Sequence, residues 1–387
     1  MEYYKLPLGV QDLLPDEQFN LNEIEAKLRR VFEGTGCQFV STAILDYYDT
    51  YSDISNRIPQ EKMFKFTDND GKLLVLRPDM TLSLARMATK HKIGSDKLCY
   101  VSPIWNAAEA GGLSAREVLQ AGVECFGRKG AFADAEIVAL AIDSLLSVGL
   151  QDFILDIGHV GFFKSVLEES GFSRERTEEV RAFVNAKNII GAERLVKGTK
   201  AEGAISALPT LFGGEEVFLR AEKLTSCTLA LAAISHLKEV YDALVSFGYG
   251  KYVSVDLGTV KSLSYYSGVV FTGLSGVIGA PVLSGGRYDN LAKDFSSDFP
   301  AVGFAIGLKR LLVALERQGS LVKAPGADLI VAARKGAEKE AFAFCQKKRA
   351  EGKKVDLFAG TEEEAMAYFS EKTGEKYLVT KEEVLSL

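Results

Sequence analysis

The spacing of apolar residues near the start of the chain predicts a long helix. Leu21, Ile24, Leu28 and Val31 recur at helical intervals within residues 16–34. Acidic residues at the beginning of this segment suit the positive end of a helix dipole. We therefore expect one face of this helix to be buried.

Further along, the period of the pattern changes from helix to strand. Residues 63–67 and 72–76 are short apolar runs on either side of an Asp-Asn-Asp-Gly turn, which predicts a β-hairpin. A helix is expected over residues 80–92, followed by a strand pair at 98–106 and 116–126.

The rest of the chain is predicted in the same way. Helix is expected at 133–148, mostly helix over 160–245, strands at 251–256, 265–272 and 276–284, and helix at about 304–317. We interpret residues 172–245 as a helical insertion.

A boundary is predicted at Pro325-Gly326, so that residues 1–325 form one domain and residues 326–387 a small second one. Strand and helix alternate in this tail, over 329–333, 336–350, 355–359, 361–370 and 376–380. That alternation predicts a small α/β unit with a parallel sheet.

The strand at 116–126 carries the clearest polar signal. Successive side chains of a strand point to opposite faces, so Gln120 and Glu124 share the face opposite Ala121 and Val123. They lie roughly 13 Å apart on either side of Gly122, from the strand rise. This arrangement predicts room for a small polar ligand over the sheet, and a solvated face explains it equally well.

The segment at 77–81 joins the hairpin to the next helix. Asp79 or Thr81 at this place is explained by ordinary N-capping. The functional interpretation is a carboxylate and a hydroxyl that hold a ligand's ammonium group.

Two later segments contain candidate ligand contacts. Tyr265 and Tyr266 are adjacent in a strand region, so at most one of them lines a given pocket. The glycines before Arg287 allow close approach of a ligand or simply form a tight turn. Arg310, near the start of a leucine-rich helix, either extends to solvent or binds an anion.

Composition and charge narrow the function classes. The 387 residues include 46 Lys and Arg against 52 Asp and Glu, a net charge of −6, which argues against binding to a nucleic-acid backbone. Five scattered Cys and three His argue against a disulfide framework and against a metal site. No apolar segment predicts a membrane span or signal peptide, so we expect a cytoplasmic location.

Several motifs, taken in order, resemble the catalytic domain of class II histidyl-tRNA synthetases. They are Leu8 to Pro15, Leu76 to Asp79, Gln120 to Glu124, Tyr265 to Gly268, Gly285 to Asp289 and Ala301 to Leu311. The resemblance spans roughly residues 5–320. It implies an α+β fold with a mostly antiparallel sheet flanked by helices, in a protein that is normally dimeric.

The sequence departs from these synthetases at the residues that handle ATP. Where the resemblance places an Arg for the α-phosphate, this chain has Asn106, and a second expected Arg corresponds to Ser114. The Arg of the synthetase's histidine-activation signature corresponds to Lys261, which cannot form the bidentate guanidinium fork. Adenylyl transfer needs this charge stabilisation, so we expect no synthetase activity and no catalytic residue.

The residues that would hold free histidine are retained. By position, Asp79, Thr81, Gln120, Glu124 and Tyr266 match the synthetase's amino-acid pocket, and Asp79 stands where the synthetases have Glu. Lys261 and Tyr265 are further candidates for binding histidine. Arg116, Arg287 and Arg310 are candidates for binding an anion. No cofactor is expected.

This combination, with its short C-terminal tail, resembles the regulatory subunits of ATP phosphoribosyltransferase, which are synthetase paralogues. That resemblance implies a short-form catalytic subunit as partner, a hetero-octamer containing a dimer of this chain, feedback by L-histidine, and no role for tRNA. The alternatives are a histidyl-tRNA synthetase with degenerate motifs, another histidine-binding paralogue, and a scaffold with a vestigial pocket.

Overall fold

The protein is described by a computed structural model that covers residues 5–52, 58–94, 96–108, 115–260, 266–295 and 298–387. The chain forms two compact units, Met1–Leu321 and Val322–Leu387, and each is described by itself.

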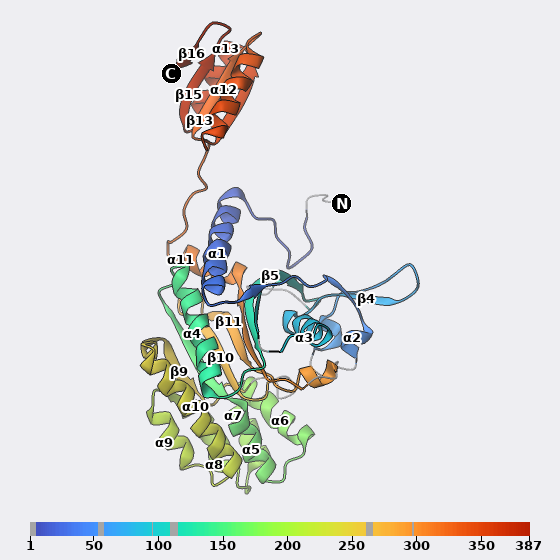
Figure 1. Ribbon diagram of the computed structural model, residues 1–387. Helices are drawn as coiled ribbons and strands as arrows, with labels where there is room; N and C mark the ends of the chain where they lie inside the picture. Colours follow the sequence, from blue (N-terminus) through green and yellow to red (C-terminus); the bar gives the residue numbers. More distant parts are fainter. Residues whose placement is uncertain (1–4, 53–57, 95, 109–114, 261–265, 296–297) are drawn as a thin grey trace. The chain divides into compact units, whose positions relative to one another are not determined.

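The first unit contains most of the secondary structure (Figure 1). Its helices are α1 Pro15–Gly34, α2 Asp49–Ser52, α3 Met80–Lys90, α4 Ala131–Ser147, α5 Val160–Glu169, α6 Arg174–Asn185, α7 Ile189–Val196, α8 Glu202–Ala207, α9 Glu216–Glu222, α10 Thr228–Ser246 and α11 Leu308–Arg317. Its strands are β1 Gln38–Phe39, β2 Leu45–Tyr47, β3 Lys65–Thr67, β4 Leu73–Leu76, β5 Lys97–Trp105, β6 Glu117–Phe126, β7 Phe153–His159, β8 Phe212–Gly213, β9 Val253–Asp256, β10 Val269–Ser275, β11 Ala280–Arg287 and β12 Ala301–Gly307.

Within the described residues, nine strands form the main sheet in the order β1-β5-β6-β12-β11-β10-β7-β9-β8. The β1–β5 and β7–β9 pairs are parallel, and the other six pairs are antiparallel. A separate sheet, β2-β4-β3, contains the predicted hairpin. The expected α+β fold, mostly antiparallel and flanked by helices, is confirmed.

The two faces of the main sheet carry different layers. Helices α1, α4 and α11 lie along one face (Figure 1). Apolar residues of these helices, and of α5 and α10, form one core with Ala121, Val123 and Cys125 of β6. Helix α3 and strand β4 pack over the other face in a second core that includes Tyr100 and Tyr288. Gln120 and Glu124 point to this second side, which is enclosed by α3 and is not an open solvated face.

Helices α6 to α10 and the short strand β8 occupy the segment interpreted as an insertion. Their apolar residues, including Val180, Val196 and Phe218, belong to the same core as the helices over the sheet. The insertion is therefore packed as part of the first unit.

Several elements of the first unit differ from the sequence prediction. The helix expected from residue 304 begins at Leu308, because Val302, Phe304 and Ile306 alternate into the core as part of β12. Strand β7 was not predicted, although it lies between β10 and β9. The strands expected at 265–272 and 276–284 are β10 and β11, each displaced toward the C-terminus.

The second unit is the predicted α/β alternation. Its elements are β13 Leu329–Arg334, α12 Glu338–Ala350, β14 Val355–Gly360, α13 Glu362–Glu371, β15 Glu375–Val379 and β16 Val384–Ser386. Strand β13 pairs in parallel with β14 and β15, as expected, while β16 adds an antiparallel edge that the sequence did not predict.

Candidate functional site

Asp79 lies where strand β4 gives way to helix α3. It is the N-cap of α3, and its Oδ1 accepts the backbone N–H of Leu82 at 2.8 Å. The carboxyl also lines two adjoining cavities, described below, and burial raises its pKa. The capping role and a ligand-binding role are therefore compatible, because capping uses one of the two oxygens.

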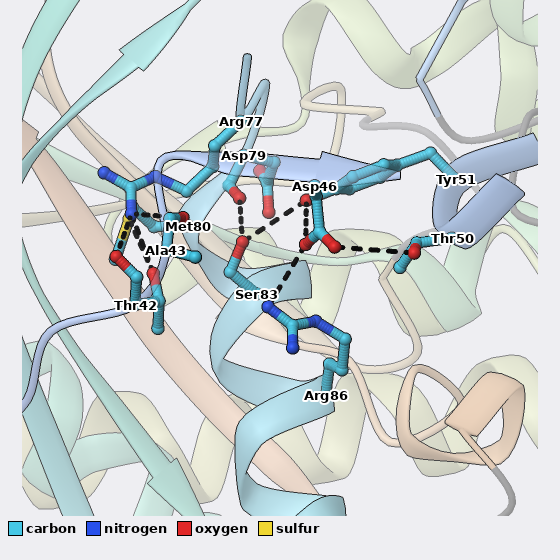
Figure 2. A network of polar contacts seen from close by, with 10 residues as sticks. All are labelled: Thr42, Ala43, Asp46, Thr50, Tyr51, Arg77, Asp79, Met80, Ser83 and Arg86. Atoms are coloured by element: carbon cyan, nitrogen blue, oxygen red, sulfur yellow. Dashed lines mark hydrogen bonds and ion pairs between the residues drawn. The ribbon is translucent and has the colours of Figure 1, made fainter. Parts of the chain in front are cut away.

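The turn before Asp79 is fixed by a fully buried arginine (Figure 2). Nη1 of Arg77 donates to the carbonyl oxygens of Thr42 and Ala43 at 3.1 Å each and to the Thr42 hydroxyl at 2.7 Å. Nη2 donates to the carbonyl oxygen of Pro103 and to the Ser102 hydroxyl at 2.7 and 3.1 Å. Burial lowers the pKa of Arg77, and these acceptors compensate its charge in place of a carboxylate.

A second set of contacts, through Ser83, Tyr51 and Asp46, fixes the first turn of α3 (Figure 2). The Ser83 hydroxyl donates to the Asp79 carbonyl oxygen at 3.3 Å and lies 3.3 Å from the Tyr51 hydroxyl. Tyr51 also donates to Asp46 at 3.4 Å, and Asp46 forms an ion pair with Arg86 at 3.1 Å. The position of Asp79 is thus determined from strand β2 as well as from its own helix.

Glu124 lies on β6, opposite the start of α3, and only 1% of its surface is exposed. Thr81 donates its hydroxyl proton to Oε1 at 2.6 Å, and the Tyr288 hydroxyl donates to Oε2. Burial is the main cause that raises the pKa of Glu124 to about 8, and the nearby Asp79 carboxyl adds to the shift. These hydroxyls leave further lone pairs of the carboxylate available for a ligand.

The sheet register makes room for this carboxyl group. Glu124 pairs with Gly303 on β12, which in turn pairs with Gly286 on β11. A side chain at Gly303 would collide with the Glu124 carboxyl, and one at Gly286 would meet the Tyr266 ring at 2.7 Å. The two glycines are therefore needed for close packing of the site's own side chains.

An inner cavity of about 120 Å³ lies over this part of the sheet. Its polar lining is Asp79, Thr81, Tyr100, Gln120, Glu124, Tyr266, Ser284 and Tyr288. The described residues that line it include two carboxyls, three phenols and two aliphatic hydroxyls, and no Lys, Arg or His. Such a lining accepts hydrogen bonds and favours a ligand with N–H donors or positive charge.

The space over Gly122 is not left for a ligand, contrary to the simplest expectation from the sequence. A Cβ at Gly122 would lie 2.5 Å from the Tyr100 hydroxyl and 2.5 Å from the Phe304 carbonyl oxygen. The Tyr100 ring fills that space. Its buried hydroxyl has no hydrogen-bond partner among the described residues, which marks an unsatisfied group in the wall of the cavity.

An outer cavity of about 330 Å³ adjoins the inner one. Both cavities are lined by Asp79, Gln120, Ser284 and Ala305. Among the described residues, the outer wall contributes two cationic side chains, Lys62 and Arg310.

Asn106, at the position of the expected phosphate-binding Arg, also lines the outer cavity. Its Oδ1 accepts the backbone N–H of Ala108 at 3.0 Å, so the side chain holds its own turn. Ser114, at the second expected Arg position, lies outside the described residues, as do Lys261 and Tyr265.

Arg287 is placed away from both cavities and is not an open anion site. It is 6% exposed and forms ion pairs with Asp134 at 2.6 Å and with Asp289 at 2.9 Å. Asp134 also contacts Nε2 of His236 at 2.8 Å. Two carboxylates thus compensate the charge that the sequence offered for a ligand.

Arg116 lines neither cavity in the described part of the chain. Its guanidinium lies 6.0 Å from the centre of the Phe64 ring. Of the three candidate anion-binding arginines, the structure places Arg310 alone beside the predicted ligand residues.

The described residues contain no group of three His, Cys, Asp or Glu placed to hold a metal ion. None of the described helices combines the length and the apolar character needed to cross a bilayer.

Comparison with known proteins agrees with this arrangement. The family model for histidyl-tRNA synthetase matches residues 9–311. A protein of Acetivibrio thermocellus named ATP phosphoribosyltransferase regulatory subunit is 41% identical over 371 residues, which cover 94% of this chain and 89% of that protein. The chain belongs to this family of synthetase-like regulatory subunits.

Solved structures show the same relationship. A Bacillus halodurans protein described as an ATP phosphoribosyltransferase regulatory subunit/histidyl-tRNA synthetase superposes with a TM-score of 0.84 at 30% identity, covering 95% of this chain and 96% of the other. The apo histidyl-tRNA synthetase of S. aureus shares the fold, with a TM-score of 0.71 at 22% identity over 97% and 91% of the two chains.

Sequence reasoning missed part of the site. Tyr100, Tyr288 and Lys62 were not identified as candidates, although Tyr288 belongs to a motif that was recognised. A glycine within a strand, such as Gly122, was the available signal that a large side chain approaches from a neighbouring strand.

Proposed function

We propose that this chain is a non-catalytic regulatory subunit of ATP phosphoribosyltransferase, which acts at the first step of histidine biosynthesis. In this role it binds L-histidine in the inner cavity, is required for the activity of a short-form catalytic subunit, and mediates feedback inhibition. The names of its relatives support the subunit role. The chemistry of the cavity supports the ligand.

The observation that carries the histidine proposal is the hydrogen-bonding character of the inner cavity. Glu124 lines this cavity, is almost fully buried and offers an acceptor to an imidazole N–H. Asp79 and Gln120 line both cavities, and there they accept the protons of an α-ammonium group. Tyr266 lies beside the imidazole position, and Lys261 and Tyr265 remain further candidates.

The absence of synthetase activity is part of the same proposal. Phosphoryl and adenylyl groups need fixed cationic donors, and Asn106 supplies none. We infer that the chain is cytoplasmic, that it forms a dimer within a hetero-octamer, and that tRNA is not its ligand.

Three assays test the function. The partner enzyme is measured without this chain, with it, and with it plus L-histidine, and we expect activation by the chain and inhibition by histidine. Calorimetric titration with L-histidine and then ATP should give binding of histidine alone. Exchange of pyrophosphate that requires both histidine and ATP would instead identify a synthetase.

A matched pair of variants assigns the effect to the cavity. Glu124→Gln should abolish inhibition by histidine, because a neutral amide cannot replace the buried carboxylate. Glu117→Gln is the control, since Glu117 lies on the same strand and faces Lys309 at 3.6 Å outside both cavities. Inhibition that survives Glu124→Gln would favour a scaffold with a vestigial pocket.

A further inference from the structure

The outer cavity contains cationic side chains, which the described lining of the inner cavity lacks. Among its described lining residues, Lys62 and Arg310 are cationic and Asp79 is the one carboxylate, located at the boundary. The inner cavity has two carboxyls and no described cation. A ligand that spans the boundary therefore meets acceptors on one side and cations on the other.

A free amino acid has this polarity. If its side chain lies against Glu124 and its ammonium group at Asp79 and Gln120, its carboxylate has to leave the shared α-carbon in a third direction. The inner cavity offers that carboxylate no described cation, and Asp79 and Glu124 would repel it. Among the described residues the outer cavity supplies the cations, and there Lys62 and Arg310 attract the carboxylate.

We propose that the outer cavity is a subsite for the carboxylate of the ligand, with Lys62 as a specificity-determining residue alongside Arg310. This inference rests on the proposed binding of histidine and adds selectivity for the amino acid over analogues that lack a carboxylate. Neither the sequence patterns nor the comparisons single out Lys62.

The position of Lys62 suits this role. It ends a short 3-10 turn, Gln60–Lys62, and its carbonyl oxygen accepts the N–H of Ala107 at 2.8 Å, which attaches the turn to the segment after β5. Its ammonium group forms no ion pair with any residue that the structure describes. An unpaired cation at a cavity wall can therefore bind a ligand anion without first losing a protein partner.

Arg310 lines the same outer cavity. It lies in the first turn of α11, and its Nη1 donates to the Pro281 carbonyl oxygen at 3.2 Å. A guanidinium presents five N–H donors in a planar fork that suits a carboxylate, so Arg310 and Lys62 can both contribute to binding it.

The experiment compares ligands that differ in one group. Binding of L-histidine, L-histidinol and histamine is measured by calorimetry on the full chain. We expect L-histidine to bind about tenfold more tightly than L-histidinol, since one charge-assisted contact at a partly exposed site is worth about that factor. Raising the ionic strength should reduce this ratio.

Lys62→Met should weaken L-histidine about tenfold and leave L-histidinol and histamine unchanged. Lys62→Arg should restore the preference, a rescue that a purely structural role would not produce. Lys65→Met is the matched control, because Lys65 is an exposed lysine on β3 whose ammonium lies over the Tyr48 ring, outside both cavities. Arg310→Met provides a second, independent variant.

The outcomes separate this inference from the function on which it rests. Equal affinity for L-histidine and L-histidinol, or equal weakening of both by Lys62→Met, would overturn the carboxylate subsite while histidine binding stands. Wild-type protein that binds none of the three ligands would overturn both proposals.

Discussion

The affinity for histidine should depend on pH with a maximum between about 6.5 and 8. Burial raises the pKa of Glu124 to about 8 in the empty site, while a free imidazole has a pKa of about 6.5. In the complex, the carboxyl and the imidazole share one proton between them. Between these two pKa values the free Glu124 carboxyl is protonated and the free imidazole is not. Binding in this pH range therefore neither releases nor takes up a proton.

Outside this pH range, the loss of affinity for histidine follows from the number of protons that binding releases or takes up. Below about pH 6.5 both free partners carry a proton, so binding releases one and affinity falls tenfold for each pH unit lost, about 1.4 kcal/mol. Above about pH 8 neither partner carries one, so binding takes up a proton and affinity falls with rising pH. At pH 5 the loss from the maximum is about 30-fold.

Titration calorimetry in buffers of different ionisation enthalpy measures both the affinity and the proton count. We expect release of close to one proton at pH 5.5, close to none at pH 7.2, and uptake at pH 8.5. Glu117→Gln should keep this profile, and the residual binding by Glu124→Gln at calorimetric concentrations should lack most of the uptake. An affinity that is constant from pH 5 to 9, or a profile unchanged in Glu124→Gln, would refute the reasoning.

Three further predictions concern the protein without ligand and its wall residues. The raised pKa of Glu124 means that folding stability is lost as pH rises from about 4.5 toward 8, so Glu124→Gln should raise the free energy of unfolding by about 1–3 kcal/mol at pH 8 and by nothing at pH 4.5, measured in urea. Arg77→Met should lower it by about 3–5 kcal/mol, because several buried acceptors lose their donor; an unchanged urea midpoint would contradict this. Tyr100→Phe removes a buried hydroxyl without a partner among the described residues, so it should not lower the urea midpoint, and it should weaken histidine binding about fivefold by calorimetry; unchanged affinity would show that the hydroxyl does not contact the ligand.

The local spacing of apolar and turn residues predicted the elements whose structure depends on neighbouring residues in the sequence. The helix α1 and the hairpin β3–β4 follow from period and turn chemistry, and both are found. Strand β12 was mistaken in part for helix because its apolar residues 302–306 continue into the leucines of α11, and only pairing with β6 and β11 distinguishes them. Strand β16 is exposed and short, so it has no burial pattern to detect.

The candidate site shows the same limit at the level of single side chains. The alternation along β6 correctly separated Glu124 from the core face, because that depends on one strand alone. It did not show that Tyr100 fills the space over Gly122, which depends on cross-strand register. Likewise, the sequence indicated that Arg287 is a cation but could not predict its pairing with Asp134, which lies 153 positions away in the chain.

These buried groups also indicate how ligand occupancy could be transmitted. A ligand shifts a conformational equilibrium only by the difference between its binding free energies in the two states. Burial raises the pKa of Glu124, and the buried hydroxyl of Tyr100 has no hydrogen-bond partner among the described residues. Both features make the empty cavity less stable than a filled one. Tyr288 donates to Glu124 and is adjacent to Arg287, whose ion pair with Asp134 reaches helix α4. If histidine binds here as we propose, ionisation of Glu124 would strengthen the hydrogen bond that Tyr288 donates to it, and histidine would then favour a state of the complex that keeps Tyr288 in this position.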